Sequence, residues 1–394
     1  MPYGTNVTLL ESQARTPVST ATTLVFVGFF VAANSRGQDE PILIHNMAEF
    51  TAAYTQYHGG GNLTDAAHIA FELLGLSQAV FINVYNAAGF DGDADDETGI
   101  YAIQKIYPKY GLTPDLVVCP VPEGLTNAQL LKVRANIVKA NGHWNGICLY
   151  DVAETSAQVD NDHAVVAEIV SSKQISDERF IACWGHVKIG DSIYPSSTYK
   201  ACLLARQDAL YNNIPMRSIG NLPAADVSCI VLESEPTKPV FLSEAQATQL
   251  ADNGITSFIN VGSNVYYTWG DSTSALTASG ITDERGRFDT TIRIMLMLGN
   301  RFQRVWRNEI DSPMDVGLRG DIISEEQGYL DYLKSVGALI GYPKCEFRPD
   351  DNTAATVQAG QFYFTDILTA TTPARYINLN IVFTSEGYSV LLEG

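Results

Sequence analysis

The sequence has few basic residues and no hydrophobic run long enough to span a membrane. Its 394 residues carry 25 Lys and Arg against 44 Asp and Glu, a formal net charge of −19. Proteins that coat nucleic acid or an anionic membrane need a positive surface, so this balance argues against both partners. The most apolar early run, residues 24–33, has about half the length of a membrane-spanning helix, and we expect a buried strand there rather than membrane insertion.

Sequence motifs for phosphate binding, metal binding and nucleophilic catalysis are missing too. The sequence contains no GxxxxGK loop followed by Ser or Thr, no GxSxG elbow and no HExxH pair. The six histidines are dispersed, and none has another histidine three or four positions away. The sequence therefore predicts no catalytic residue, no cofactor and no metal ligand.

Cysteine usage and the N-terminus indicate the compartment. The six cysteines are scattered without a CxxC pair, and three of them lie inside apolar runs. The first residues lack the basic and apolar segments of a signal peptide. We expect reduced thiols in a chain made in a cytoplasm.

The first half of the sequence alternates short apolar runs with amphipathic stretches. Runs that are apolar on both faces and separated by helices are typical of a parallel sheet covered on both sides. We expect strands at 24–31, 79–84, 116–120, 147–150 and 180–184. We expect helices at 47–57, 65–74, 127–139 and 159–171. The fold class that follows is a doubly wound α/β domain over residues 23–230.

The pattern changes after the turn-rich segment 233–239. We expect a helix from Glu244 to the stop signal Asn253–Gly254, a hairpin over 257–269, and long helices at 290–309 and 324–337. These elements predict a second domain, of α+β class, over residues 231–372.

Both ends of the chain alternate polar and apolar residues in the manner of a strand with one apolar face. Such a strand must pair within its own domain or with the open sheet edge of a neighbour, and the pattern alone favours neither. We treat residues 1–22 and 373–394 as two arms. The side chains that inter-subunit pairing would bury are Val7, Leu9, Ile377, Leu379, Ile381, Phe383, Val390 and Leu392.

One acidic cluster, Asp91–Glu97, has the alternating aspartates of a calcium-binding loop. An EF-hand also needs glycine at its sixth position and glutamate at its twelfth, where this sequence has Asp96 and Ala102. We therefore expect a solvated acidic loop rather than a cation site.

Basic residues also cluster once, as six arginines between positions 285 and 307. Two interpretations are equally consistent with this cluster: a solvated face paired with nearby carboxylates, or a docking surface for an acidic neighbour. The candidates for docking contacts are Arg301, Arg304 and Arg307.

Taken in order, several of these segments resemble the contractile tail sheath proteins of phages, phage-tail-like bacteriocins and related injection systems. The resemblance covers most of the chain, and its specificity lies in the order and spacing of the blocks. It departs from the family at Arg375, where an acidic residue is common. The matching blocks are Thr16–Val18 with Leu24–Gly28, Pro41–Ile44 with Met47–Phe50, Pro114–Pro120, Tyr194–Ser197 with Leu204–Asp208, Asn253–Ile255, Tyr266–Gly270, Gly337–Gly341 and Thr372–Ile377.

The resemblance implies a structural subunit and not an enzyme. Members of the family polymerise as stacked hexameric rings around an inner tube, and contraction drives that tube through a target cell envelope. The resemblance further implies an outer α/β domain, an inner α+β domain that presents Arg301, Arg304 and Arg307 to the tube or a neighbour, and arms that insert as strands into neighbouring subunits.

Expected partners follow from the same resemblance. They are other copies of the chain, the inner tube protein, and the baseplate and terminator proteins at the sheath ends, with no nucleic acid. We expect assembly in a bacterial cytoplasm and residence in a phage tail or phage-tail-like particle. The alternative is an α/β enzyme or small-molecule-binding protein with a site at the carboxyl ends of its strands. Only the fold class favours that alternative, and the missing phosphate loop argues against it.

Overall fold

The structure, a computed structural model, describes residues 22–30, 37–54, 62–120, 125–138, 144–262 and 265–388. A mixed nine-stranded sheet forms the body of the molecule, and its strand order is β11-β14-β13-β8-β5-β4-β1-β3-β2. Six neighbouring strands are parallel: β1 (Leu24–Gly28), β3 (Ala79–Asn83), β4 (Leu116–Val118), β5 (Ile147–Asp151), β8 (Phe180–Cys183) and β13 (Ile255–Asn260). Three antiparallel strands complete the edges: β2 (Ile42–Ile44), β14 (Tyr266–Trp269) and β11 (Pro223–Ala224).

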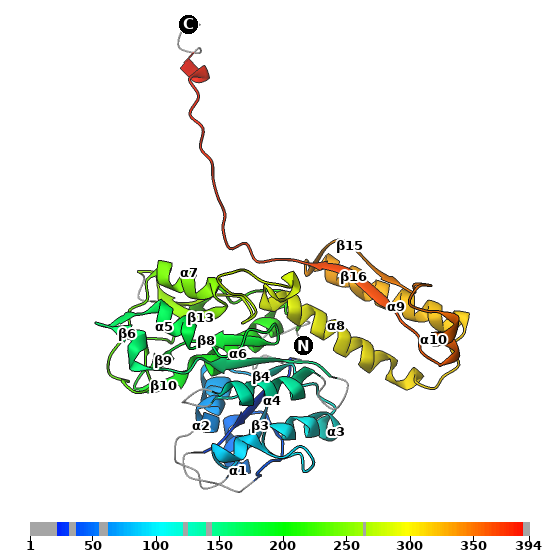
Figure 1. The fold of residues 1–394 in the computed structure, drawn as a ribbon, viewed down its shortest axis with the longest axis horizontal. Helices are drawn as coiled ribbons and strands as arrows, with labels where there is room; N and C mark the ends of the chain where they lie inside the picture. The colour runs from blue at the N-terminus through cyan, green and yellow to red at the C-terminus, as the bar shows by residue number, and fades with distance from the viewer. Residues whose placement is uncertain are drawn as a thin grey trace, which may run out of the picture.

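Helices cover both faces of this sheet, as the doubly apolar strands predict (Figure 1). Leu24 and Phe26 of β1 belong to the core on one face, and Val25 and Val27 belong to the core on the other. The first face is covered by α1 (Met47–Ala53), α2 (Asn62–Ala67), the π-helix η1 (His68–Leu73) and α6 (Ser196–Leu210). The second face is covered by η3 (Gly99–Lys105), α3 (Ile106–Tyr110), α4 (Asn127–Val138), α5 (Val166–Ser171) and α7 (Glu244–Asp252). Because these strands have no polar face, helices must bury both sides.

The sheet continues past residue 230, where the sequence places a domain boundary. The expected hairpin is confirmed as β13 and β14, but β13 also pairs in parallel with β8, so that Ile255 lies opposite Ala182. Its residues alternate between the two cores, with Phe258 on one face and Ile259 on the other. The segment up to about residue 270 is therefore part of the same sheet.

Two helices begin at positions other than those expected. The expected helix at 159–171 starts only at Val166, because Asn161 and Asp162 adopt positive φ values and turn the chain between β6 (Val159–Asp160) and β7 (His163–Ala164). The expected helix at 324–337 starts earlier, at Val316, where the Asp315 carboxylate accepts a hydrogen bond from the Leu318 amide. That N-cap satisfies one free donor of the first turn.

The helix after Ser243 is confirmed in both of its end signals. Ser243 and Gln246 form a capping box at the start of α7. Gly254 follows the helix with φ +70, and a Cβ there would lie 2.6 Å from the carbonyl oxygens of Thr273 and Leu276. Glycine is therefore required by both conformation and space.

Smaller elements complete the body. A three-stranded sheet joins β9 (His186–Ile189), β10 (Ser192–Pro195) and β12 (Cys229–Val231). The short 3-10 helices are η2 (Ala88–Asp91), η4 (Ser156–Gln158), η5 (Glu284–Gly286), η6 (Arg307–Glu309) and η7 (Glu386–Tyr388). All six cysteines are free thiols, as expected. Nowhere in the described ranges is a helix both long enough and apolar enough to cross a membrane.

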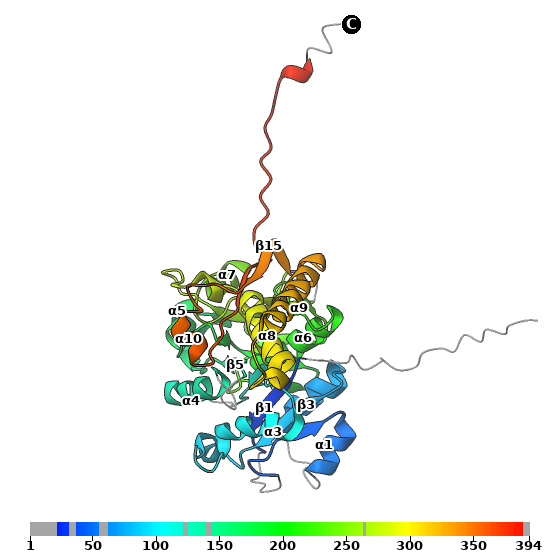
Figure 2. The ribbon, with the colours of Figure 1, turned by 90° about the vertical axis from the view of Figure 1, so that its right-hand side faces the viewer.

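A C-terminal lobe, residues 289–370, extends from one end of the body (Figure 1). It contains α8 (Asp289–Trp306), α9 (Val316–Ser335), β15 (Leu339–Glu346), α10 (Ala354–Gln358) and β16 (Thr365–Ala370). Its small core of its own includes Leu298, Leu330 and Leu339. Beyond the lobe the chain runs away from the rest of the molecule as a long extended segment in both views (Figures 1 and 2).

Candidate assembly interface

The extended segment, residues 376–388, is called the arm below. Ile377, Leu379, Ile381 and Phe383 are 89, 81, 85 and 78 % exposed. Within the part of the chain that the structure describes, no strand pairs with residues 376–385. Four large apolar side chains at alternate positions are therefore held in water, which is unfavourable unless another surface covers them.

The lobe presents a sheet of only two strands. β15 and β16 pair antiparallel with each other, and among the described residues neither has a second strand partner. A register shift between Ile340 and Lys344 interrupts the pair, and within it Tyr342 is 93 % exposed. Helix α9 packs against β15. On the outer side of β15 the Cys345 amide donates to the Gln327 side-chain oxygen at 3.2 Å, and the Gln327 side-chain nitrogen donates to the Pro343 carbonyl at 3.1 Å. The outer edge of β16 is therefore the more open template for an incoming strand.

Arg375 fixes the base of the arm to the body. Its Nε donates to the Asp271 carboxylate at 2.7 Å, and its Nη2 donates to Asp271 and to the Ser272 hydroxyl. Its Nη1 lies 3.8 Å from the exposed Asp252 carboxylate, and its guanidinium lies 5.0 Å from the centre of the Phe288 ring. Asp271 is buried. The arm therefore begins at a charge-assisted, largely desolvated contact.

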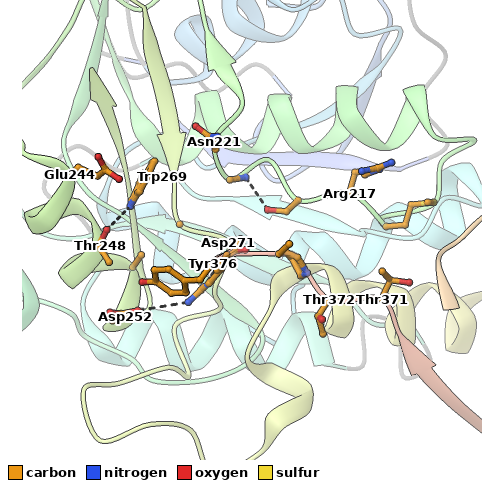
Figure 3. Close-up of a pocket in the computed structure, with 18 of the residues that line it drawn as sticks. Arg217, Asn221, Glu244, Thr248, Asp252, Trp269, Asp271, Thr371, Thr372 and Tyr376 are labelled. Carbon is orange, nitrogen blue, oxygen red and sulfur yellow. Dashed lines mark hydrogen bonds and ion pairs between the residues drawn. The ribbon is translucent and has the colours of Figure 1, made fainter. Parts of the chain in front are cut away.

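A groove of about 690 Å³ runs beside this contact (Figure 3). On one side lie Trp269 and Thr248, which share a hydrogen bond of 3.3 Å. On the other side lie Thr371 and Thr372 of the segment that leads from β16 to the arm. Thr371 is held to the lobe, because its amide donates to the Ala338 carbonyl at 3.0 Å. The segment from 371 to 375 thus joins lobe and body.

The predicted strand residues divide into two groups. Ile377, Leu379, Ile381 and Phe383 lie together on the arm, extended and exposed, but in no sheet. The other four, Val7, Leu9, Val390 and Leu392, lie outside the described residues. Within one copy of the chain the described arm is not a closing strand of its own domain.

The three candidate docking arginines lie in different environments. Arg301 is 14 % exposed and binds both oxygens of the buried Glu326, at 2.9 and 3.0 Å, and stacks on the Tyr329 ring. It joins α8 to α9 inside the lobe and does not present its charge outward. Arg307 donates to the Tyr107 hydroxyl at 2.6 Å, on the body. Arg304 is exposed.

The rest of the arginine cluster is paired within the chain. Arg285 and Arg287 form exposed ion pairs with Asp283 and Glu284, as the solvated-face interpretation predicts. Arg293 is different, because it is buried and pairs with the buried Asp208 of α6. Most of the cluster therefore stabilises local structure.

The acidic cluster is a solvated loop. The Asp93 carboxylate accepts a hydrogen bond from the Asp95 amide at 2.8 Å, and Asp91 pairs with Lys132 at 2.9 Å. Across the described residues, no three His, Cys, Asp or Glu side chains converge as a metal site would require.

The carboxyl end of the parallel sheet is where an α/β enzyme would bind its substrate. There the Ser197 amide donates to the Asp151 carboxylate at 2.9 Å, and His186 pairs with Glu154 at 2.7 Å. Burial raises the pKa of Asp151 to about 6. Burial disfavours the imidazolium, but the hydrogen bond that the ring donates to Glu154, together with the nearby carboxylate charges, outweighs burial and raises the pKa of His186. The Asp151 carboxylate and the His186 ring are thus buried and hydrogen-bonded within the chain.

Sequence reasoning missed the contact between Arg375 and Asp271, because 104 positions separate the two residues. It also missed the outer edge of β16, which has no strand partner among the described residues. The sequence of β15 does not alternate polar and apolar residues, and it contains Gly341 and Pro343, so it gave no clear strand signal.

Comparisons with known proteins identify related chains. No family model matches the sequence. The tail sheath protein of Burkholderia phage BcepMu is 23 % identical over 331 residues, which cover 81 % of this chain and 64 % of that protein. The chain thus matches somewhat less than two thirds of the length of its curated relative.

Two solved structures share the fold. A chain of the 6-fold symmetrised anti-feeding prophage baseplate aligns with a TM-score of 0.69 at 15 % identity, over 97 % of this chain and 98 % of that one. A chain of the contracted sheath complex of PVC, an extracellular contractile injection system, aligns with a TM-score of 0.69 at 14 % identity, over 98 % and 99 %. These relatives are components of sheath and baseplate assemblies, not enzymes. In sequence and in fold, the chain is therefore similar to the contractile tail sheath proteins, as its ordered sequence blocks predict.

Proposed function

We propose that the chain is a subunit of a contractile sheath. Copies polymerise as stacked hexameric rings around an inner tube, and contraction of the sheath drives the tube through a target cell envelope. The observation that carries this proposal is the arm, whose four exposed apolar side chains alternate along an extended backbone. The likeness of the whole chain to chains of a contracted sheath complex and of a 6-fold symmetrised baseplate supports the same assembly.

The arm of one copy adds as a strand to the β15–β16 sheet of a neighbour. Residues 377–383 span roughly 23 Å when extended, which matches the eight residues of β15. Main-chain hydrogen bonds then supply affinity, and the alternate side chains enter apolar contacts. The N-terminal arm, residues 1–22, supplies a further strand to this exchanged sheet through Val7 and Leu9.

The remaining partners follow from the sheath architecture. The α/β body faces outward, and the lobe faces the inner tube with Arg304 as one of its exposed cations. The baseplate and terminator proteins bind the ends of the polymer. The net charge of −19 favours neither nucleic acid nor an anionic membrane as a partner. The chain assembles in a bacterial cytoplasm and resides in a phage tail or phage-tail-like particle.

Electron microscopy and sedimentation test the proposal. The purified chain is examined alone and with tube protein, beside two truncations that lack residues 1–21 or 376–394. We expect ringed tubes from the full chain and folded monomers from the truncations, because the arm makes no strand pairing with its own body. Matching thermal unfolding of the monomers controls for folding. Tubes from both truncations would contradict strand exchange, and no polymer in the presence of tube protein would contradict the sheath function.

A further inference from the structure

Helix α8 contacts the base of the arm at its first turn. The amide of Asp289, its first residue, donates to the Asp271 carbonyl at 3.0 Å, and the side chain of Asp271 holds Arg375. Phe288, the N-cap, lies under the Arg375 guanidinium and forms a bridge with Ser272. The start of α8 and the base of the arm therefore share Asp271 and Ser272.

The same helix holds the first described residues of the chain. The Thr22 hydroxyl donates to the Asp208 carboxylate at 2.9 Å, and Arg293 of α8 pairs with that carboxylate. The Thr23 amide donates to the Asp115 carboxylate at 2.9 Å.

Asn300 of α8 also contacts Asp115, the carboxylate that accepts from the Thr23 amide. Its amide donates to Asp115 at 3.3 Å and to the Asn145 carbonyl at 2.8 Å. Arg293 and Asn300 are seven positions apart, which places them on one face of the helix at roughly 10 Å along its axis.

Stability alone does not explain these contacts. Arg293, Asp208 and Asn300 are all buried. A buried ion pair gains little over apolar packing of the same volume, because desolvation offsets the attraction. Hydrogen bonds differ from apolar contacts in being directional, so they fix where a segment lies and which way it points.

We infer that α8 is a common anchor that fixes the position and direction of the chain at Thr22 and Thr23 and at Arg375. The C-terminal anchor is Arg375 with Asp271, and the N-terminal anchor is Thr22 and Thr23 with Asp208 and Asp115. If the proposed function holds, one rigid helix sets the spacing between the two links that a subunit makes to its neighbours.

The rate of trypsin cleavage after Arg375 in the monomer reports how firmly the C-terminal anchor holds. Cleavage after Arg375 requires that its side chain leave Asp271, and it releases residues 376–394, which contain no Lys or Arg. We expect Asp271→Asn to accelerate this release by about tenfold or more, because a charge-assisted contact is lost. Asp252→Asn is the matched control and should change the rate little, since Asp252 is exposed and 3.8 Å away. Cleavage after the exposed Arg217 serves as the internal reference.

The hydrogen exchange rate of the Thr23 amide reports how firmly the N-terminal anchor holds. Asn300→Leu removes the α8 contact to Asp115, and we expect the Thr23 amide to exchange about tenfold faster. Asn308→Leu, in the exposed η6 turn, is the matched control and should leave this amide unchanged.

The two readouts separate this inference from the proposed function, because neither requires assembly. Unchanged cleavage in Asp271→Asn, or unchanged Thr23 exchange in Asn300→Leu, would overturn the anchor. Faster cleavage after Arg375 in Asp271→Asn together with faster Thr23 amide exchange in Asn300→Leu would support the anchor, even if the chain formed no tubes. Where wild-type tubes form, Asp271→Asn should shorten them or lower their yield.

Discussion

Apolar residues occupy alternate positions along the arm, and this pattern allows a matched test of strand exchange between copies. The perturbation replaces its apolar face, Ile377, Leu379, Ile381 and Phe383, with serine. Burying each side chain in a neighbour contributes about 1.5–3 kcal/mol, so the full face contributes roughly 6–12 kcal/mol per link before ordering costs. A single Leu379→Ala substitution, at about 2 kcal/mol, should weaken each link roughly 30-fold.

The free monomer provides the internal control. Since these side chains are 78–89 % exposed, their replacement should leave the midpoint of thermal unfolding of the monomer unchanged. Sedimentation velocity across a concentration series, with negative-stain images of the pellet, reports the assembly threshold. We expect the threshold to rise for Leu379→Ala and tubes to disappear for the fourfold variant.

The polar face of the same segment is the matched control. This opposite face consists of Asn378, Asn380, Val382 and Thr384, and replacing its three polar residues with serine keeps length and backbone while sparing every apolar side chain. Tubes from the fourfold apolar variant at the wild-type threshold would refute the reasoning. An equal loss from the polar-face variant would refute it as well, because the effect would then not depend on the face.

Three further predictions concern the folded chain. Burial raises the pKa of Asp289 from 3.8 to about 6, so the folded state binds a proton more readily than the unfolded state and stability rises as pH falls from about 7 to 4. At 1.36 kcal/mol per unit the contribution of Asp289 is up to roughly 3 kcal/mol. The rise measured by urea unfolding at the two pH values should be smaller by that amount in Asp289→Asn, because Asp151 and other buried carboxyls contribute in the same direction. Arg301→Met leaves the buried Glu326 unpaired and should lower the free energy of unfolding by about 3–5 kcal/mol, whereas Arg304→Met should change it by less than about 0.5 kcal/mol. Calcium should not shift thermal unfolding, because Asp91 and Asp93 already have partners; a saturable shift in calorimetry would contradict the solvated-loop interpretation.

The local pattern of apolar residues was sufficient to predict the sheet of the body and the helices on both of its faces. The runs containing Val25, Val80 and Val117 have apolar residues on both faces, and only a sheet with helices on both faces buries them completely. Both ends of α7 could be predicted from the sequence as well, since Ser243 caps its first turn and Gly254 allows the turn that follows its last residue. These features depend on residues a few positions apart.

Pairings between distant segments could not be read in this way. Nothing within β13 indicates that Ile255 lies beside Ala182, so a boundary at residue 230 divided a continuous sheet. The arginine cluster likewise gave two interpretations, because the partners Glu326 and Asp208 lie 25 and 85 positions from Arg301 and Arg293. The apolar face of the arm was visible in the sequence, whereas its exposure required the structure.

The large sheet ends in two strands that are poor templates for further pairing. β2 has only three residues, and the Leu43 amide donates to the Tyr110 hydroxyl at 3.2 Å instead of remaining free. β11 has two residues and begins with Pro223, which has no amide hydrogen. Wherever copies of the chain are crowded together, an arm that could pair with any edge would crosslink them in the wrong order. If the proposed strand exchange holds, an incoming arm finds a longer template on the lobe than on the short, partly capped edges of the large sheet, and this difference would protect the chain against disordered aggregation.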